Sequence, residues 1–281
     1  FFQVHMEPVI IRFVAAFIFS VFIIKIIWTL FLVIDDIIRI FRWFTRDLGL
    51  NKTPGYESNS NQQGIGRLAF INYLGLGIAA LFFSSALWGV VKGAHNYLVN
   101  KRKLYIKNLP KSFEGLKVIQ ISDIHCGSFW SREAVERGID LINKQDADFV
   151  FFTGDLVNDR HTEVHEYMDI FNKLKAPLGV YSTLGNHDYG DYVAWESEYA
   201  KKENLAKLKN IHAELGWRLL MNEHVVLTRE NDSIALLGIE NWGAKGRFPK
   251  YGKMHEAHPG TEKYSFKILL SHDPSHWDAE V

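Results

Sequence analysis

The sequence predicts an α/β domain preceded by two membrane-spanning helices. Two long apolar stretches lie before residue 100 of the 281-residue chain, and the remainder has the composition of a soluble domain. In that remainder, short runs of β-branched and large apolar residues alternate with amphipathic segments, which is typical of β-α-β units. Several of these runs end in Asp, His or Asn, so the predicted strands carry polar side chains at their carboxyl ends.

Residues 9–34 form the first predicted membrane span, because they are almost wholly apolar and long enough to cross a bilayer as a helix. Residues 68–91 form the second, and their Gly, Ala and Ser residues allow helices to approach closely in lipid. Lys25 lies within the first span, where it either snorkels or faces a neighbouring helix, or makes a polar contact inside a helical bundle. We therefore divide the chain into a membrane region, residues 1–100, and a soluble domain, residues 101–281.

The charge pattern leaves the membrane orientation open. Lys and Arg are almost equally frequent between the two spans and after the second span, so the positive-inside rule gives little asymmetry. Residues 36–46 carry apolar side chains opposite arginines and are expected to extend the first helix along the membrane surface. Over the whole chain, 32 basic and 32 acidic residues cancel, so no nucleic-acid partner is expected. The single cysteine, Cys126, excludes an internal disulfide framework.

The soluble domain begins with a regular alternation of predicted elements. We expect strands at residues 117–122, 149–153 and 178–184, with helices at residues 132–144 and 163–174 between them. Such a β-α-β-α-β series winds right-handed into one sheet.

A longer polar segment, residues 195–223, also has helical spacing. We expect Leu208 and Ile211 to face inward and His212 to face outward. The segment is interpreted as a crossover helix that covers the sheet, with a lid over the site as the alternative.

The polar residues that follow the predicted strands point to metal chemistry. Ligands collect at the carboxyl ends of strands in an open α/β sheet, and oxygen and imidazole groups together suit Mn, Fe, Zn or similar divalent ions. A carboxylate can bridge two such ions, which then clamp a phosphate and activate a water. The candidate residues are Asp123, His125, Asp155, Asn186, His187, Asp188 and His272.

Four motifs carry a resemblance to a known family. In order and spacing they resemble the motifs of the calcineurin-like metallophosphoesterases, and the resemblance covers residues 104–281. Within that family, the membrane-anchored bacterial branch is the most similar. This branch includes enzymes similar to UDP-diacylglucosamine pyrophosphohydrolases. The resemblance implies a four-layer fold with two sheets face to face and helices outside. The motifs are Asp123-Ile124-His125, Gly154-Asp155-Leu156-Val157-Asn158-Asp159, Gly185-Asn186-His187-Asp188 and Ser271-His272-Asp273.

The resemblance also implies a role for each candidate residue. His187 would stabilise charge on the phosphate or protonate the leaving oxygen, and Asp188 would hold its ring. A histidine paired with a carboxylate is a suitable acid near neutral pH in any case. Two divalent ions are implied: Asp123, His125 and Asp155 would hold the first, and Asp155, Asn186 and His272 the second.

The expected function is therefore that of a membrane-anchored phosphodiesterase or pyrophosphatase that uses two metals and a metal-bridging hydroxide. Its substrate would be a phosphate ester or pyrophosphate, with a lipid-linked substrate as an additional expectation from the two spans. We expect a multi-pass protein of the bacterial inner membrane and favour the cytoplasmic side for the soluble domain. The alternative is a metal-poor scaffold of the same fold that binds a protein partner.

One departure from the family pattern concerns the end of the chain. The Gly-His-x-His motif, which gives each metal a further imidazole, does not follow His272. We interpret this as truncation of a longer protein.

Four further residues have a structural and a functional interpretation. Asp159 is expected to cap the next helix, and Cys126 to be a packed side chain rather than a metal ligand. His276 is expected at the surface or the substrate rim, and Trp242 either packs or contacts substrate.

Overall fold

The computed structural model describes residues 8–47, 66–243 and 250–280. Contacts within the chain divide it into two compact units, Phe1–Leu98 and Val99–Val281. Where the first unit is described it is helical, whereas the second contains two β-sheets.

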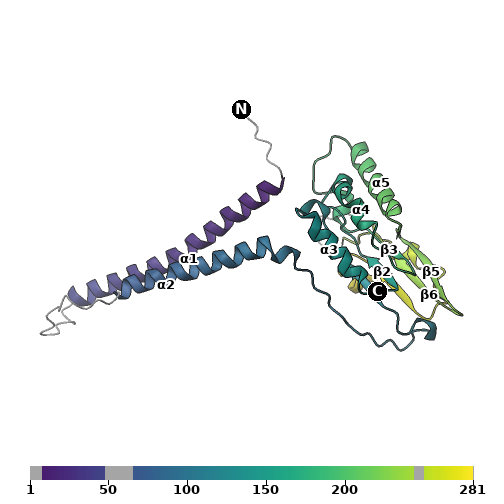
Figure 1. Ribbon diagram of the computed structural model, residues 1–281, viewed down its shortest axis with the longest axis horizontal. Helices are drawn as coiled ribbons and strands as arrows, with labels where there is room; N and C mark the ends of the chain where they lie inside the picture. The colour runs from purple at the N-terminus through teal and green to yellow at the C-terminus, as the bar shows by residue number, and fades with distance from the viewer. Residues whose placement is uncertain (1–7, 48–65, 244–249, 281) are drawn as a thin grey trace. The chain divides into compact units, whose positions relative to one another are not determined.

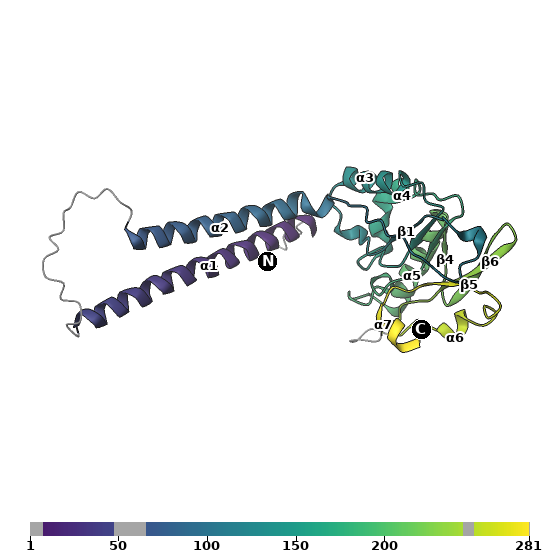
Figure 2. The ribbon, with the colours of Figure 1, turned by 90° about the horizontal axis from the view of Figure 1, so that it is seen from below.

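Two long helices lie side by side in the first unit (Figures 1 and 2). Helix α1 covers Pro8–Asp47 and α2 covers Arg67–Val91, so α1 continues through the predicted surface extension without a break. A Cβ atom on Gly75 would lie 2.8 Å from the ring of Phe31, so glycine permits the close approach of the helices there. By length and composition both helices can cross a membrane. Lys25 is exposed on the outside of the pair.

The first sheet of the second unit consists of four parallel strands in the order β1-β2-β3-β4. Ser131 and Ser197 are the N-cap residues of two helices that cover this sheet, since each side chain accepts a hydrogen bond from the main-chain N–H group three residues later. The strands are Val118–Ile121, Phe149–Phe152, Val180–Ser182 and Trp217–Leu219. The connecting helices are α3 (Arg132–Asn143), the 3-10 helix η4 (His161–Tyr167), α4 (Met168–Phe171) and α5 (Glu198–Glu214).

The second sheet has three strands in the order β5-β6-β7. Strands β5 (Glu223–Arg229) and β6 (Asp232–Gly238) form an antiparallel hairpin, and β7 (Lys267–Leu270) runs parallel to β6. The remaining described elements are α6 (Met254–Ala257), α7 (Ser275–Glu280), η1 (Gly93–His95), η2 (Lys111–Phe113), η3 (Cys126–Ser128) and η5 (His187–Tyr189).

The hydrophobic core is layered, and β2 shows why. Successive side chains of a strand point to opposite faces of its sheet. Phe149 and Phe151 therefore pack against the second sheet at Leu236, whereas Val150 and Phe152 pack against the helices. A smaller cluster under α6 covers the other face of the second sheet. Two sheets flanked by helices are what the resemblance implied, so the expected fold class is confirmed.

The segment at residues 163–174 differs from the prediction of one regular helix. It consists of the 3-10 helix η4 followed by the single turn α4. The carboxylate of Glu163 accepts hydrogen bonds from the main-chain N–H groups of Asn158, Asp159 and Arg160. Such local side-chain bonds compete with regular helix formation and hold the start of the segment in a tight turn.

The segment at residues 195–223 is a helix only as far as Glu214, and it then turns at Gly216 into β4. Leu208 and Ile211 are buried in the core, which identifies α5 as a helix covering the sheet. The predicted outward position of His212 is wrong, because its side chain is fully buried and its Nδ1 atom lies 3.0 Å from Ser182 Oγ. The buried arc of α5 is therefore wider than its apolar stripe indicates.

Candidate metal centre

The predicted ligands follow the carboxyl ends of four strands and converge there. Asp123 and His125 follow β1, Asp155 follows β2, and His272 follows β7. Asn186, His187 and Asp188 follow β3. His272 joins this site although it lies more than a hundred positions after Asp123 in the sequence.

The loops that carry these residues are strained. Asp123, His125 and Asp155 adopt left-handed backbone conformations with φ angles of 54°, 49° and 60°. Each such conformation costs on the order of 1–3 kcal/mol for a residue with a side chain. Strain of this kind concentrates at functional sites, so its presence in two adjacent loops supports a site here.

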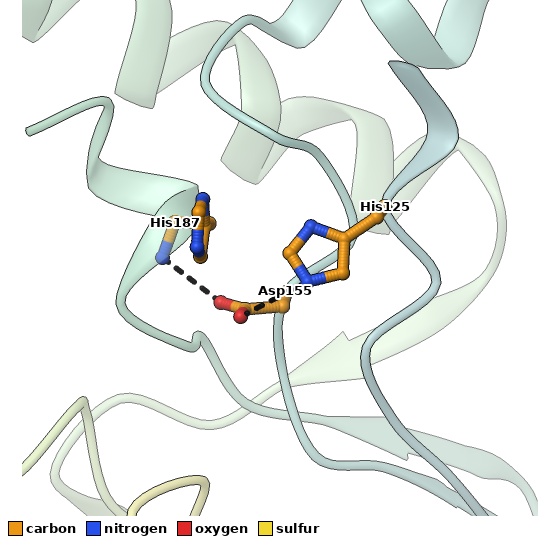
Figure 3. Close-up of side chains that lie close together, drawn as sticks. All are labelled: His125, Asp155 and His187. Carbon is orange, nitrogen blue, oxygen red and sulfur yellow. Dashed lines mark hydrogen bonds and ion pairs between the residues drawn. The ribbon is translucent and has the colours of Figure 1, made fainter. Parts of the chain in front are cut away.

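One group of candidate ligand atoms surrounds His125, and Figure 3 shows its members His125, Asp155 and His187. His125 Nε2 lies 3.5 Å from Asp155 Oδ2 and 3.9 Å from Asp123 Oδ1. The ring of His187 lies edge-on to the ring of His125, with centroids 4.7 Å apart. His125, Asp155 and His187 offer ligand atoms within 4.8 Å of one another.

A second group surrounds His272. Its Nε2 atom lies 3.4 Å from Asp155 Oδ2 and 3.1 Å from Asn186 Oδ1. Asp123, Asp155 and His272 likewise offer ligand atoms within 4.8 Å of one another. The other oxygen of Asp155, Oδ1, accepts a hydrogen bond from the main-chain N–H of His187 at 2.9 Å. Oδ2 of Asp155 is therefore the atom that both groups share.

Both imidazoles are oriented as metal ligands usually are. His272 Nδ1 lies 2.8 Å from the carbonyl oxygen of Thr153, which can only accept, so Nδ1 carries the hydrogen. His125 Nδ1 lies 3.0 Å from Asn158 Oδ1, which is also an acceptor. In a neutral ring that carries its hydrogen on Nδ1, the lone pair is on Nε2, the atom that faces Asp155. Without a metal, His272 Nε2 carries a hydrogen as well, because the oxygens of Asp155 and Asn186 that it faces can only accept. Ligating histidines commonly donate their second N–H in this way, so the residues present fit a divalent ion.

The arrangement of Asp188 corrects one expectation. Asp188 does not hold the ring of His187, whose Nδ1 atom instead lies 2.8 Å from the carbonyl oxygen of Asn158. The buried carboxylate of Asp188 accepts hydrogen bonds from the main-chain N–H groups of Asp155, Leu156, Val157 and Gly185. It therefore ties the loop after β2 to the loop after β3, because four converging N–H groups satisfy a buried carboxylate better than one ring nitrogen could.

The charges in the site act on one another. Burial alone would lower the pKa of His272, but the hydrogen bond and negative charge of Asp155 raise that pKa to about 9. Burial tends to raise the pKa of Asp155, but the contact with His272 prevails and lowers it. Burial and the neighbouring Asp155 raise the pKa of Asp188 to about 7, although the N–H groups around it act in the opposite direction. Asp155 is thus held as an anion and attracts positive charge.

Three residues of the site were given no role from the sequence. Asn158 contacts both His125 and His187. Glu163 holds the loop at 158–160, and its position three residues after Arg160 is a capping-box spacing that could have revealed it. Tyr192 contacts Asn186 and His187, and no sequence pattern indicates this.

The structure also bears on the four residues that had both a structural and a functional interpretation. Cys126 is buried in the hydrophobic core, as expected for a packed side chain. His276 is also buried, against the ring of Trp242, so its predicted position at the surface or the substrate rim is wrong. Trp242 is buried as well, as its packing interpretation expects. Asp159 does not cap the next helix, since the N-cap residue of η4 is Arg160 and Glu163 accepts from the main-chain N–H of Asp159.

Two family models match the chain, one in each of its units. Residues 116–280 match the calcineurin-like phosphoesterase family, and residues 1–94 match a probable calcineurin-like phosphoesterase transmembrane domain. The first match covers more than half of the chain, which therefore belongs to the calcineurin-like phosphoesterase family. The expected family is confirmed.

Several curated relatives are similar to parts of the chain. A transmembrane protein with metallophosphoesterase domain from Danio rerio is 30% identical over 193 residues, 67% of this chain and 42% of the relative. The uncharacterized metallophosphoesterase YkuE of Bacillus subtilis is 30% identical over 109 residues, 37% of this chain and 38% of the relative. The UDP-2,3-diacylglucosamine pyrophosphatase LpxG of Chlamydia trachomatis is 38% identical over 91 residues, 31% of this chain and 28% of the relative. The matched region spans less than half the length of each relative.

Proposed function

We propose that this chain belongs to a membrane-anchored two-metal phosphohydrolase. The observation that carries the proposal is the sharing of Asp155 Oδ2 between the two groups of ligand atoms, around His125 and around His272. A bridging carboxylate flanked by two oriented imidazoles suits a pair of divalent ions better than a single ion.

In this proposal each residue has a defined task. Two divalent ions, when bound, activate a water and offset the charge of the phosphate. The first ion would be held by Asp123, His125 and Asp155, and the second by Asp155, Asn186 and His272.

His187 would move the proton in the reaction. Its Nδ1–H is held by the carbonyl of Asn158, which fixes the ring and leaves Nε2 to give a proton to the leaving oxygen. Asp188 would keep the two ligand loops together.

The substrate is proposed to be a phosphodiester or a phosphoric anhydride with a lipid part. Residues 1–100 would anchor the site in a membrane as a multi-pass segment, with the domain on the cytoplasmic side. Support comes from the two apolar helices and from the similarity to a pyrophosphatase whose name gives a diacylated substrate.

The proposal is tested with the full-length protein in detergent. With Mn²⁺, the wild type should hold two ions per chain and cleave bis-p-nitrophenyl phosphate or a soluble pyrophosphate diester, and Asp155→Ala should abolish both. Asp169→Ala is the matched control, because Asp169 is exposed and pairs with Arg132 outside the site. No turnover by the wild type, or full turnover by Asp155→Ala, would refute the proposed chemistry. A protein without stoichiometric metal would instead be the scaffold.

The lipid part of the proposal has its own test. Turnover of a lipid-borne pyrophosphate in mixed micelles should exceed that of its soluble headgroup analogue. Equal turnover of the two substrates would remove the lipid from the proposal and leave the two-metal chemistry standing.

A further inference from the structure

Tyr192 contacts two of the proposed site residues at once. Its hydroxyl oxygen accepts a hydrogen bond from Asn186 Nδ2 at 2.6 Å. Its ring lies against the ring of His187, with centroids 4.4 Å apart and planes inclined at 36°. Tyr192 is 44% exposed, so part of its side chain faces solvent beside these two residues.

The hydrogen bond to Tyr192 bears on which end of the Asn186 amide faces the ligands. A carboxamide can coordinate a cation only through its oxygen, since the NH₂ group has no lone pair to offer. With Nδ2 directed to the Tyr192 hydroxyl, Oδ1 of Asn186 lies 3.1 Å from His272 Nε2, within the second group of ligand atoms. The phenol therefore holds the amide in the orientation that coordination requires.

The loop that carries Tyr192 is held firmly enough for this task. Gly190 turns the chain with a φ angle of 66°, and its carbonyl accepts a hydrogen bond from Trp195 Nε1 at 2.7 Å. The guanidinium of Arg160 lies 4.4 Å from the Trp195 ring, and Asp191 pairs with Lys201 of α5. The residues on both sides of Tyr192 are thus anchored, and a ligand-orienting group works only when its own support is rigid.

We propose that Tyr192 is a positioning residue that acts through Asn186 and His187. Its hydroxyl holds the Asn186 oxygen toward the second ion, and its ring limits the motion of the His187 imidazole. This inference rests on the proposed two-metal function.

The first test removes the hydroxyl and keeps the ring, with Tyr192→Phe in the full-length protein. Calorimetric titration of the metal-free protein with Mn²⁺ should show that one of the two ions binds about tenfold more weakly. This is the lower end of the usual range for the loss of an orienting group, and we expect it because water can replace the phenol hydroxyl. The kcat should recover when Mn²⁺ is saturating. Tyr199→Phe is the matched control, since Tyr199 is 75% exposed at the start of α5, and it should leave both affinities unchanged.

The second test removes the ring as well. Tyr192→Leu should show the same weaker Mn²⁺ binding and, in addition, a lower kcat that saturating Mn²⁺ does not restore, with KM little changed. Thermal unfolding in EDTA, unchanged in both variants, would show that the effects do not come from folding.

The outcomes distinguish a wrong role for Tyr192 from a wrong two-metal function. Wild-type Mn²⁺ affinities in Tyr192→Phe, or a kcat loss in that variant that persists at saturating Mn²⁺, would overturn the role of the hydroxyl. A wild-type protein that binds no Mn²⁺ would overturn the two-metal function itself.

Discussion

Replacement of Asp188 by Asn tests whether this carboxylate joins the two ligand loops or orients His187. The buried carboxylate accepts four main-chain hydrogen bonds. Oδ2 accepts from Asp155 and Gly185 at 2.9 Å each, and Oδ1 accepts from Leu156 at 2.8 Å and Val157 at 3.3 Å. An Asn side chain has nearly the same shape but only one acceptor oxygen.

The magnitude follows from counting the lost partners. The amide oxygen of Asn can serve one pair of N–H groups, whereas its NH₂ group faces the other pair. A buried donor left without a partner costs about 1–3 kcal/mol, so we expect Asp188→Asn to lower the free energy of unfolding by about 2–6 kcal/mol. Because the loops carry Asp155 and Asn186, Mn²⁺ affinity should fall as well.

The assay is chemical denaturation of the full-length protein in detergent with EDTA present, followed by Mn²⁺ titration. Asp169→Asn, at an exposed ion pair with Arg132, serves as the control and should change stability little. If Asp188→Asn had wild-type stability and Mn²⁺ affinity but lost kcat, Asp188 would act on the chemistry through His187, and the structural reasoning would be wrong.

Three further changes test other parts of the structure. Gly185→Ala places a Cβ atom against Asp155 Oδ1, so it should lower the free energy of unfolding by about 1–3 kcal/mol and weaken Mn²⁺ binding. Thermal melting curves measure the first effect, and Gly77→Ala is the control because a Cβ atom there would have nothing within 4 Å. Asn158→Leu removes the acceptor of His125 Nδ1 and should weaken Mn²⁺ binding about 10–100-fold, whereas Asn158→Asp keeps an acceptor and should retain binding in the same titration. Burial lowers the pKa of His212 to about 4, below its ordinary 6.5. The unfolded chain then binds more protons at this residue between these values, so the contribution of His212 to stability should fall by about 3 kcal/mol as pH decreases from 6.5 to 4. In denaturation at each pH, the wild type should lose this amount relative to a His212→Phe variant, and equal slopes for the two proteins would contradict the assignment.

Much of the fold was predictable because its signals are local. The strands β1, β2 and β3 and the helix α3 correspond to continuous runs or amphipathic stripes, and these patterns depend only on neighbouring residues. Strand β4 was missed because it follows α5 within a few residues and was included in the helical segment predicted at residues 195–223. The burial of His212 was missed because it depends on Ser182, a residue thirty positions away.

The sequence by itself determined which residue types stand at the carboxyl ends of the strands, and with them the family and the candidate ligands. Only the tertiary structure decided which atoms meet: Asp155 Oδ2 between two imidazoles, Asp188 on main-chain N–H groups, and Tyr192 on Asn186. The physical reason is that hydrogen bonds between distant segments orient these side chains, as Thr153 orients His272 across 119 positions. Residue order along one strand carries no information about that distant partner.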